Sequence, residues 1–246
     1  MWLFDKFKEL KTKKLEREVK SHLKVIKNPK SIREDRVAAI DYFKAFEDPE
    51  TAVPALLSRF DFSLEHGIND SREKESVMAG IIACKEKSVP FVKDYLRKST
   101  RIAWPIKILG QLISESEMIQ TLEGCMDFNE VSFDREKTDK NYDILCYLRE
   151  YKLPDHGHKF LHFLKDHDER VRFAVVEVLL EQNDEEVYLL LEPFAADDSA
   201  ENTRMRQAVV EHFLNRKRPL HLKELFPVGP FMPGVGVDKS FRFFKI

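Results

Sequence analysis

Residues 168–194 read DERVRFAVVEVLLEQNDEEVYLLLEPF: a charged start, an apolar helix, a short acidic break and a second apolar helix. In both halves the apolar residues recur at intervals of three and four, which is typical of a helix that buries one face. Residues 33–57 (REDRVAAIDYFKAFEDPETAVPALL) repeat the whole pattern, and residues 202–214 (NTRMRQAVVEHFL) repeat its first helix. Recurring helix pairs of this length predict a stacked helical array.

The spacing of the copies sets the expected size of the array. Arg172 and Arg206 are 34 positions apart, and Arg36 and Arg72 are 36 apart, which are periods typical of helix-pair repeats. We therefore predict an all-α fold: an α-solenoid of about five helix pairs over residues 30–215. We call the first helix of each pair helix A and the second helix B.

Several local predictions follow from the same pattern. Asp48-Pro49 is expected to make the turn between the first two helices, and the fifth helix pair is expected to start from Asp168. The second helix A is expected to start at Asp70 or Ser71, either of which is a good cap, and Asp134 is another cap candidate. A helix B is expected from about Pro154. The residues expected to face inward on the last two B helices are Phe160, Leu161, Leu164, Val187, Leu190, Leu191 and Phe194.

The two ends of the chain differ from the array. Residues 1–29 read as an amphipathic helical cap with Lys on its polar face, ended by Asn28-Pro29. Residues 216–246 are rich in Pro, Gly and Phe, which excludes a helix around 226–236. Because this tail is too apolar to remain free, we expect it to dock on the last helix as a non-helical cap, with a docking peptide for a partner as the alternative.

Composition limits the classes of function. Residues 1–30 hold ten Lys or Arg against four Asp or Glu, and residues 202–246 hold nine against three, while the whole chain has a net charge of −2. The middle is therefore acidic, and no nucleic-acid partner is expected. Cys84, Cys125 and Cys146 show no paired spacing, and no apolar leader follows Met1. These features predict a cytoplasmic protein with free thiols.

The start of helix A resembles a known family. Arg-Val-Arg at 170–172 and Arg-Met-Arg at 204–206, each followed by x-Ala-Val-Val-Glu, resemble HEAT repeats of the armadillo-type α-solenoid class. In that family an Asp and an Arg or Val near the start of helix A hold adjacent repeats together. The resemblance implies this role for Asp168 with Arg170, Val171 and Arg172, and less fully for Asp35 with Arg36 and Val37. HEAT-like arrays are mostly scaffolds and adaptors, so the resemblance implies architecture more than chemistry.

The favoured hypothesis is a non-catalytic scaffold or adaptor that binds another protein through its concave helix B surface. No cofactor is expected. Placing every helix B inward puts the following residues near that surface: Arg59, Lys93, Arg97, Gln120, His158, His162 and Tyr188.

Two enzymatic alternatives remain open. Four His lie between His156 and His167, and His158 and His162 are four residues apart, which on an α-helix places both on one face and suits two ligands of a metal. Because no second pair of ligands is evident, these two are only weak metal candidates, and no metal is the favoured interpretation. The second alternative is nucleic-acid binding like that of HEAT-like DNA glycosylases, through a basic patch that includes Lys93, Arg97 and Arg101 near Trp104.

A third alternative is peripheral membrane association. Trp2, Leu3, Phe4 and Phe7 with flanking lysines suit a helix lying in a membrane interface, although Asp5 and Glu9 interrupt its cationic face.

Overall fold

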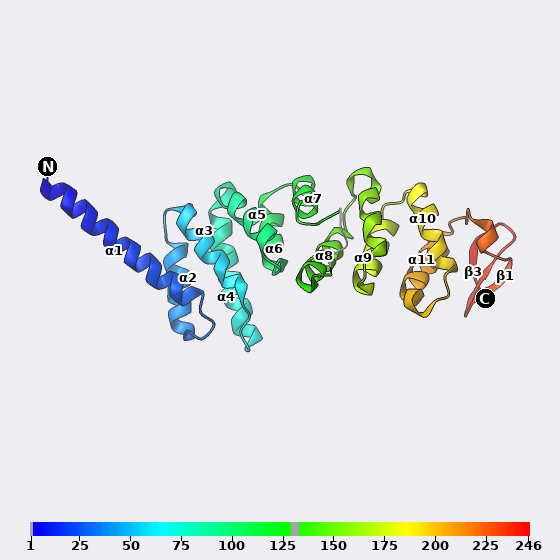
Figure 1. The fold of residues 1–246 in the computed structure, drawn as a ribbon, viewed down its shortest axis with the longest axis horizontal. Helices are drawn as coiled ribbons and strands as arrows, with labels where there is room; N and C mark the ends of the chain where they lie inside the picture. Colours follow the sequence, from blue (N-terminus) through cyan, green and yellow to red (C-terminus); the bar gives the residue numbers. More distant parts are fainter. Residues whose placement is uncertain (1, 129–132) are drawn as a thin grey trace. The chain divides into compact units, whose positions relative to one another are not determined.

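The computed structural model describes residues 2–128 and 133–246, without the side chains of residues 2–12 and His156. The described chain is mostly helical, with one small three-stranded sheet near its C-terminal end, so the predicted all-α body is confirmed (Figure 1). The chain divides into two compact units, Met1–Cys125 and Met126–Ile246. No helix among the described residues is long and apolar enough to cross a membrane.

Unit 1 contains a long first helix and three pairs of shorter ones. In chain order its elements are α1 (Trp2–Ile26), α2 (Arg33–Lys44), α3 (Pro49–Leu57), η1 (Ser58–Asp61), α4 (Gly67–Ala83), η2 (Lys85–Ser88), α5 (Val89–Lys98), α6 (Ala103–Leu112) and α7 (Glu115–Glu123). The A helices α2, α4 and α6 contact one another in succession, and the B helix α3 contacts the B helix α5.

Local chemistry explains where the first helix pair begins and what it buries. Asp48 caps α3 by accepting hydrogen bonds from the backbone N–H of Glu50 and Thr51, both at 3.2 Å, and Pro49 occupies the first turn. The sequence predicted the break between the two helices at this point. The apolar faces of α2 and α3 are buried against each other, with Ile40 and Leu56 at most 1% exposed. The apolar residues that recur in the sequence of this pair are therefore the residues that pack its two helices together.

The prediction that Asp70 or Ser71 caps the second helix A is wrong, because α4 already begins at Gly67. Asp70 instead lies one turn into the helix, where its carboxylate accepts hydrogen bonds from Arg59 and Lys74. The same short acidic side chain that suits a helix cap is used here as a buried partner for two cations.

Unit 2 combines a helical part with the small sheet. Its elements are α8 (Arg135–Leu148), η3 (Pro154–Lys165), α9 (Glu169–Leu180), α10 (Glu185–Ala196), η4 (Ala200–Asn202), α11 (Thr203–Arg216), η5 (Lys223–Leu225), β1 (Gly229–Met232), β2 (Val235–Val237) and β3 (Phe243–Lys245). Asp134, Asp168 and Asp184 cap α8, α9 and α10 through backbone N–H groups. Asp134 was a predicted cap, and Asp168 was predicted as the start of its helix pair. Helices α8, α9 and α11 contact one another in succession.

The segment after Pro154 is a 3₁₀ helix rather than an α-helix. A 3₁₀ helix has three residues per turn, so side chains three apart share a face. Phe160 and Phe163 are accordingly buried, whereas Leu161 and Leu164, which we expected to face inward, are partly exposed. The prediction is confirmed for Phe160 and wrong for Leu161 and Leu164, because it assumed 3.6 residues per turn.

Leu190 of α10 is a second error in the predicted core. It is 48% exposed, because the buried face of α10 runs through Val187, Tyr188, Leu191 and Ala195. Of the three consecutive leucines only Leu191 faces the core, and Leu189 is 40% exposed, so the run of leucines concealed which of them is buried.

The chain beyond α11 is non-helical apart from the single turn η5, and it forms an antiparallel sheet in the order β1-β2-β3. Phe226, Phe231 and Phe243 pack together with ring centroids 5.3–5.7 Å apart. Strand β3 contacts α11, and the carboxylate of Glu192 in α10 accepts hydrogen bonds from the segment that leads into the sheet. The predicted docking of the tail thus has a concrete set of contacts, although the sequence did not indicate strands.

Candidate interaction surfaces

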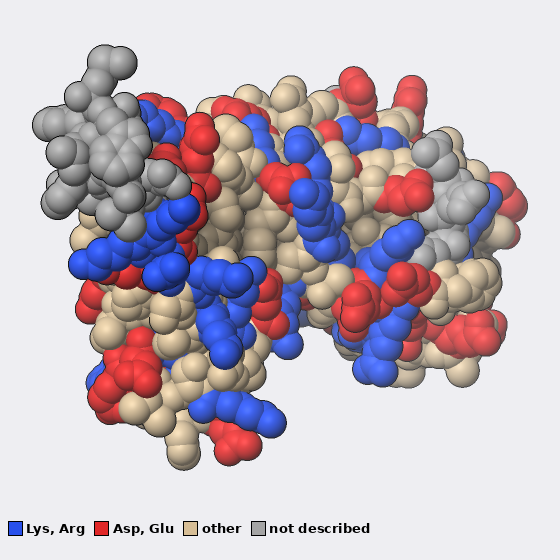
Figure 2. Space-filling view, turned by 60° about the vertical axis from the view of Figure 1, so that its left-hand side comes forward, with Lys and Arg blue, Asp and Glu red and all other residues tan. Residues whose placement is uncertain are grey.

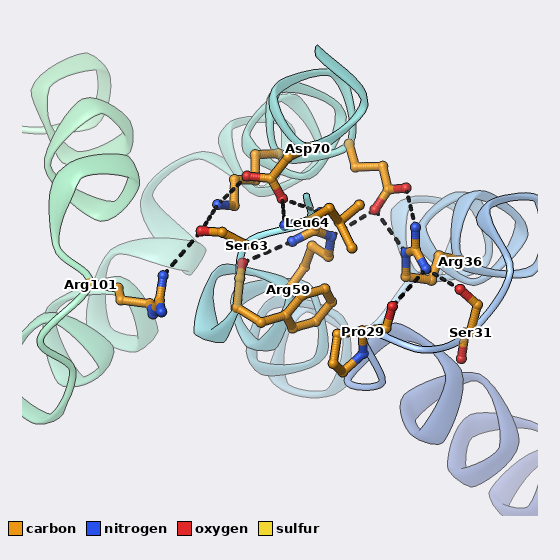
Figure 3. Close-up of polar contacts among 11 residues, drawn as sticks. Pro29, Ser31, Arg36, Arg59, Ser63, Leu64, Asp70 and Arg101 are labelled. Carbon is orange, nitrogen blue, oxygen red and sulfur yellow. Dashed lines mark hydrogen bonds and ion pairs between the residues drawn. The ribbon is translucent and has the colours of Figure 1, made fainter. Parts of the chain in front are cut away.

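A buried network of charges joins α2, η1 and α4 in unit 1 (Figure 3). Glu73 accepts two hydrogen bonds from Arg36, both at 3.0 Å, and one from Nε of Arg59 at 2.8 Å. Asp70 accepts from Arg59 at 2.7 Å and from Lys74 at 2.6 Å. Buried charges persist only where they are paired and hydrogen-bonded in this way, so the network fixes the position of α4 against the first helix pair.

The carboxylates of the network are held in their ionised form. Burial alone would raise the pKa of Glu73, but hydrogen bonds from Arg36 and Arg59 outweigh it and lower the pKa. Asp70 behaves likewise: burial raises its pKa, and the bonds from Lys74 and Arg59 lower it overall. The sequence contained a signal for this, because Asp70 and Glu73 occupy the same helical stripe as the buried Val77 and Ile81.

Arg59 is therefore not part of a binding surface, and that prediction is wrong. Its side chain is 0% exposed. Its guanidinium donates hydrogen bonds to the carboxylates of Asp70 and Glu73 and lies 4.3 Å from the ring centroid of Phe62. The reason is that α3 ends at Leu57 and the chain tightens into η1, which turns Arg59 toward α4 instead of along the surface of helix B.

The other candidates in unit 1 remain at the surface. Lys93 of α5 forms an ion pair with Glu117 of α7 at 2.6 Å, and Arg97 and Gln120 are exposed on the same two helices. The ion pair thus brings Lys93 next to Glu117, and Glu117 lies one turn before Gln120 on α7.

A groove of about 290 Å³ runs between the B helices α3 and α5. Its apolar lining comes from Pro54, Leu57, Phe91 and the ring of Tyr95. The Tyr95 hydroxyl donates a hydrogen bond to Asp61 at 2.8 Å, which ties α5 to the end of η1. An apolar floor with a polar rim is the usual composition of a site for a peptide side chain.

In unit 2, Tyr188 is also buried, so its predicted place on a binding surface is wrong. The side chain is 0% exposed, and its hydroxyl lies 3.0 Å from the carbonyl oxygen of Leu180, 3.1 Å from Oδ1 of Asn183 and 3.1 Å from Nε2 of His212. A tyrosine with this many polar neighbours can be buried at low cost, since its hydroxyl keeps its hydrogen bonds.

His212 borders a hollow of about 570 Å³ in unit 2. Residues of α9, of α11 and of the segment that follows α8 line it, including Glu177, Glu181 and Glu211. Burial, reinforced by the positive charge of Arg216, lowers the pKa of His212 to about 4. His212 is therefore neutral at pH 7 and serves as a hydrogen-bonding partner of Tyr188.

This lowered pKa predicts a loss of stability in mild acid. The unfolded chain binds a proton at an ordinary pKa of 6.5, whereas folded His212 resists protonation until about pH 4, so stability falls as the pH drops through that window. After an allowance for solvent screening we expect a loss of about 1–2 kcal/mol. Urea unfolding of unit 2, followed by circular dichroism at pH 7 and pH 4.5, should show it. The His212→Gln variant, which can still donate to Tyr188, should show a smaller loss; equal losses in both proteins would assign the effect to other groups.

The metal hypothesis for His158 and His162 gains no geometric support. In η3 two residues four apart point about 120° from one another, so these rings do not share a face. His158 lies 3.7 Å from Asp184, and His162 packs edge-on against Phe163. Within the described side chains, which exclude His156, no three His, Cys, Asp or Glu lie close enough together to hold a metal.

A repeated contact links the A helices of unit 2. Arg170 of α9 lies over the ring of Tyr142 in α8 and pairs with Asp139 at 2.7 Å. One repeat later, Arg204 of α11 lies 4.2 Å from the ring centroid of Phe173 in α9 and 4.0 Å from Glu169. Each Arg thus reaches back to an aromatic ring and a carboxylate of the preceding helix A.

Charge on the surface is mixed. Figure 2 shows short groups of Lys and Arg side chains that are bordered by Asp and Glu on the face it draws. The nucleic-acid and membrane hypotheses stay predictions.

No family model, curated protein or solved structure matches this chain.

Proposed function

We propose that this chain is a cytoplasmic, non-catalytic α-solenoid of HEAT-like repeats that binds another protein. Three features support the repeat architecture: A helices that contact one another in succession within each unit, Asp caps on the A helices α8 and α9 and on the B helices α3 and α10, and the recurring contact of Arg170 and Arg204 with the preceding helix A. Arrays of this kind bind partners along extended surfaces built from equivalent helices.

The binding surface that we propose is the α3–α5 groove with its neighbours Lys93, Arg97 and Gln120. The observation that carries this choice is the apolar lining of the groove, because Phe91 and Tyr95 provide aromatic contact area beside exposed charged side chains. Aromatic residues in a partly enclosed site supply most of the free energy in typical protein interfaces.

A photo-crosslinking experiment tests this proposal. A photoreactive amino acid at Lys98, which lines the groove, should form an adduct with one partner in native cell lysate. The matched control carries the same group at Lys87, an exposed lysine of η2 that does not line the groove. We expect the Lys98 adduct alone, and its partner can then be purified for binding measurements.

With the purified partner, Phe91→Ala should weaken binding about ten-fold or more, as truncation of a central aromatic anchor does. Lys87→Ala should leave binding unchanged within two-fold. Adducts only at the control position, or a partner that binds Phe91→Ala as tightly as the unaltered chain, would assign binding to another surface.

A further inference from the structure

A second, different surface lies on the A-helix side of unit 1, between α2 and α4. Three aliphatic side chains are exposed there: Ile32 by 61%, Val37 by 37% and Ile68 by 73%. Arg33, Val37 and Asn69 line one hollow of about 190 Å³, and Ile32 and Ile68 directly precede two of these residues. Isolated exposed aliphatic residues are ordinary on protein surfaces, but here three lie on or just before two contacting helices, and one of them, Val37, lines the hollow between these helices, which together indicate a contact surface.

Two arginines line the same hollow. Arg33 and Arg72 form no ion pair with any residue whose side chain the structure describes. Between them, the carboxylate of Glu73 is already engaged by Arg36 and Arg59. The two surface guanidinium groups are therefore available to a ligand, and no carboxylate in the hollow competes for them.

The buried network beneath the hollow adds to this positive charge. It contains three cations, Arg36, Arg59 and Lys74, against two carboxylates, Asp70 and Glu73. Among the charged side chains that line the hollow itself, the two cations Arg33 and Arg72 outnumber the single carboxylate of Glu73. A charge excess held partly in a low-dielectric interior projects its field into the adjoining hollow.

The other acidic side chains of α2 and α4 are Glu34, Asp35, Asp41 and Glu75; they do not line this hollow, and they oppose its field from outside. Glu34 and Asp41 border the neighbouring hollow of about 400 Å³, which Arg33 and Val37 also line. Asp41 lies 3.4 Å from Lys44, so its charge is offset locally. The hollow between α2 and α4 itself contains no other acidic side chain than Glu73.

We propose that this α2–α4 surface binds an acidic peptide segment of a partner protein, with an aliphatic or aromatic anchor beside its carboxylates. Arg33 and Arg72 bind the carboxylates, as the planar guanidinium group favours. Ile32, Val37 and Ile68 contact the apolar anchor. This surface is distinct from the α3–α5 groove, so the two proposals can fail independently.

The probe is a fluorescein-labelled peptide that alternates Asp or Glu with Leu or Phe, titrated with the full chain in fluorescence anisotropy. We expect saturable binding that weakens as salt rises from 50 to 500 mM, since the contacts are ionic and exposed. Arg33→Ala combined with Arg72→Ala should weaken binding at least ten-fold, and Ile68→Ser about five-fold. Neither arginine belongs to the buried network, and unchanged Trp104 fluorescence would verify the fold.

Three controls make the outcome decisive. Arg135→Ala removes an equally exposed arginine from α8 in unit 2, and Phe91→Ala removes the anchor of the α3–α5 groove; both should leave peptide binding unchanged. A peptide with Asn and Gln in place of Asp and Glu should bind at least ten-fold more weakly. The proposal is overturned by equal affinity for the two peptides, by an arginine double variant that still binds, or by no binding at millimolar peptide. It is also overturned if vesicles with anionic lipid bind through these arginines and the peptide does not.

Discussion

Replacing Glu73 by Gln is expected to destabilise unit 1 by about 3–5 kcal/mol. The substitution keeps the shape of the side chain but removes the charge that two buried guanidinium groups share. Arg36 and Arg59 are 4% and 0% exposed, so water cannot replace the lost carboxylate. The cost is mainly that of leaving buried charge unpaired, rather than the loss of one favourable contact.

Urea unfolding can isolate this effect in unit 1. The chain has two tryptophans, Trp2 and Trp104, so a Trp2→Phe background leaves Trp104, which stacks on Phe60, as the reporter. Asp94→Asn is the matched control, because its exposed pair with Lys98 should contribute at most about 1 kcal/mol. If Glu73→Gln costs no more than Asp94→Asn, the network does not hold α4 in place.

The acid sensitivity of the network has a defined direction. The pKa of Glu73 is lower in the folded protein than in the unfolded chain, so its contribution is present above the ordinary carboxyl range and is lost as the pH falls below it. The effect of Glu73→Gln on the free energy of unfolding should therefore shrink on acidification.

The helices could be predicted from short stretches of sequence, because caps and apolar stripes act over a few neighbouring residues. Asp48, Asp134 and Asp168 cap their helices through backbone groups two or three residues away, and no distant contact is needed to make them effective. The apolar stripe of α9 was equally readable, since it faces the core along its whole length. These elements needed only the periodicity and chemistry of about fifteen residues.

The candidate surface was less predictable because it depends on how helices end. Arg59 looked like a surface residue of helix B, but the switch to η1 after Leu57 turns it inward. His158 and His162 looked like a pair of ligands, but the 3₁₀ geometry of η3 separates them. Neither change of helical geometry has a strong signature in the local sequence. The partners of these side chains are also distant in sequence: Glu73 reaches Arg59, and Asp184 reaches His158, only after folding.

Glu192→Ala is expected to release the C-terminal sheet from α10. Glu192 is 0% exposed, and its carboxylate accepts hydrogen bonds from the backbone N–H of His221 at 2.8 Å and of Leu222 at 2.7 Å. It also lies 2.9 Å from Nδ1 of His221. Truncation leaves two backbone donors without their acceptor, and each unsatisfied buried donor costs about 1–3 kcal/mol. We expect docking of residues 217–246 to weaken by about 2–4 kcal/mol.

Hydrogen exchange followed by mass spectrometry measures this locally. The amides of His221 and Leu222 should exchange about 30-fold faster or more in Glu192→Ala, because every 1.4 kcal/mol corresponds to a ten-fold change in the opening equilibrium. Glu186→Ala, an exposed position on the same helix, should leave their exchange unchanged. Faster exchange throughout α9 and α11 as well would show that the sheet is an integral part of the core of unit 2. Acceleration confined to residues 217–246 would show that the carboxylate of Glu192 holds the C-terminal sheet in place, and that this sheet can detach while the helices remain folded.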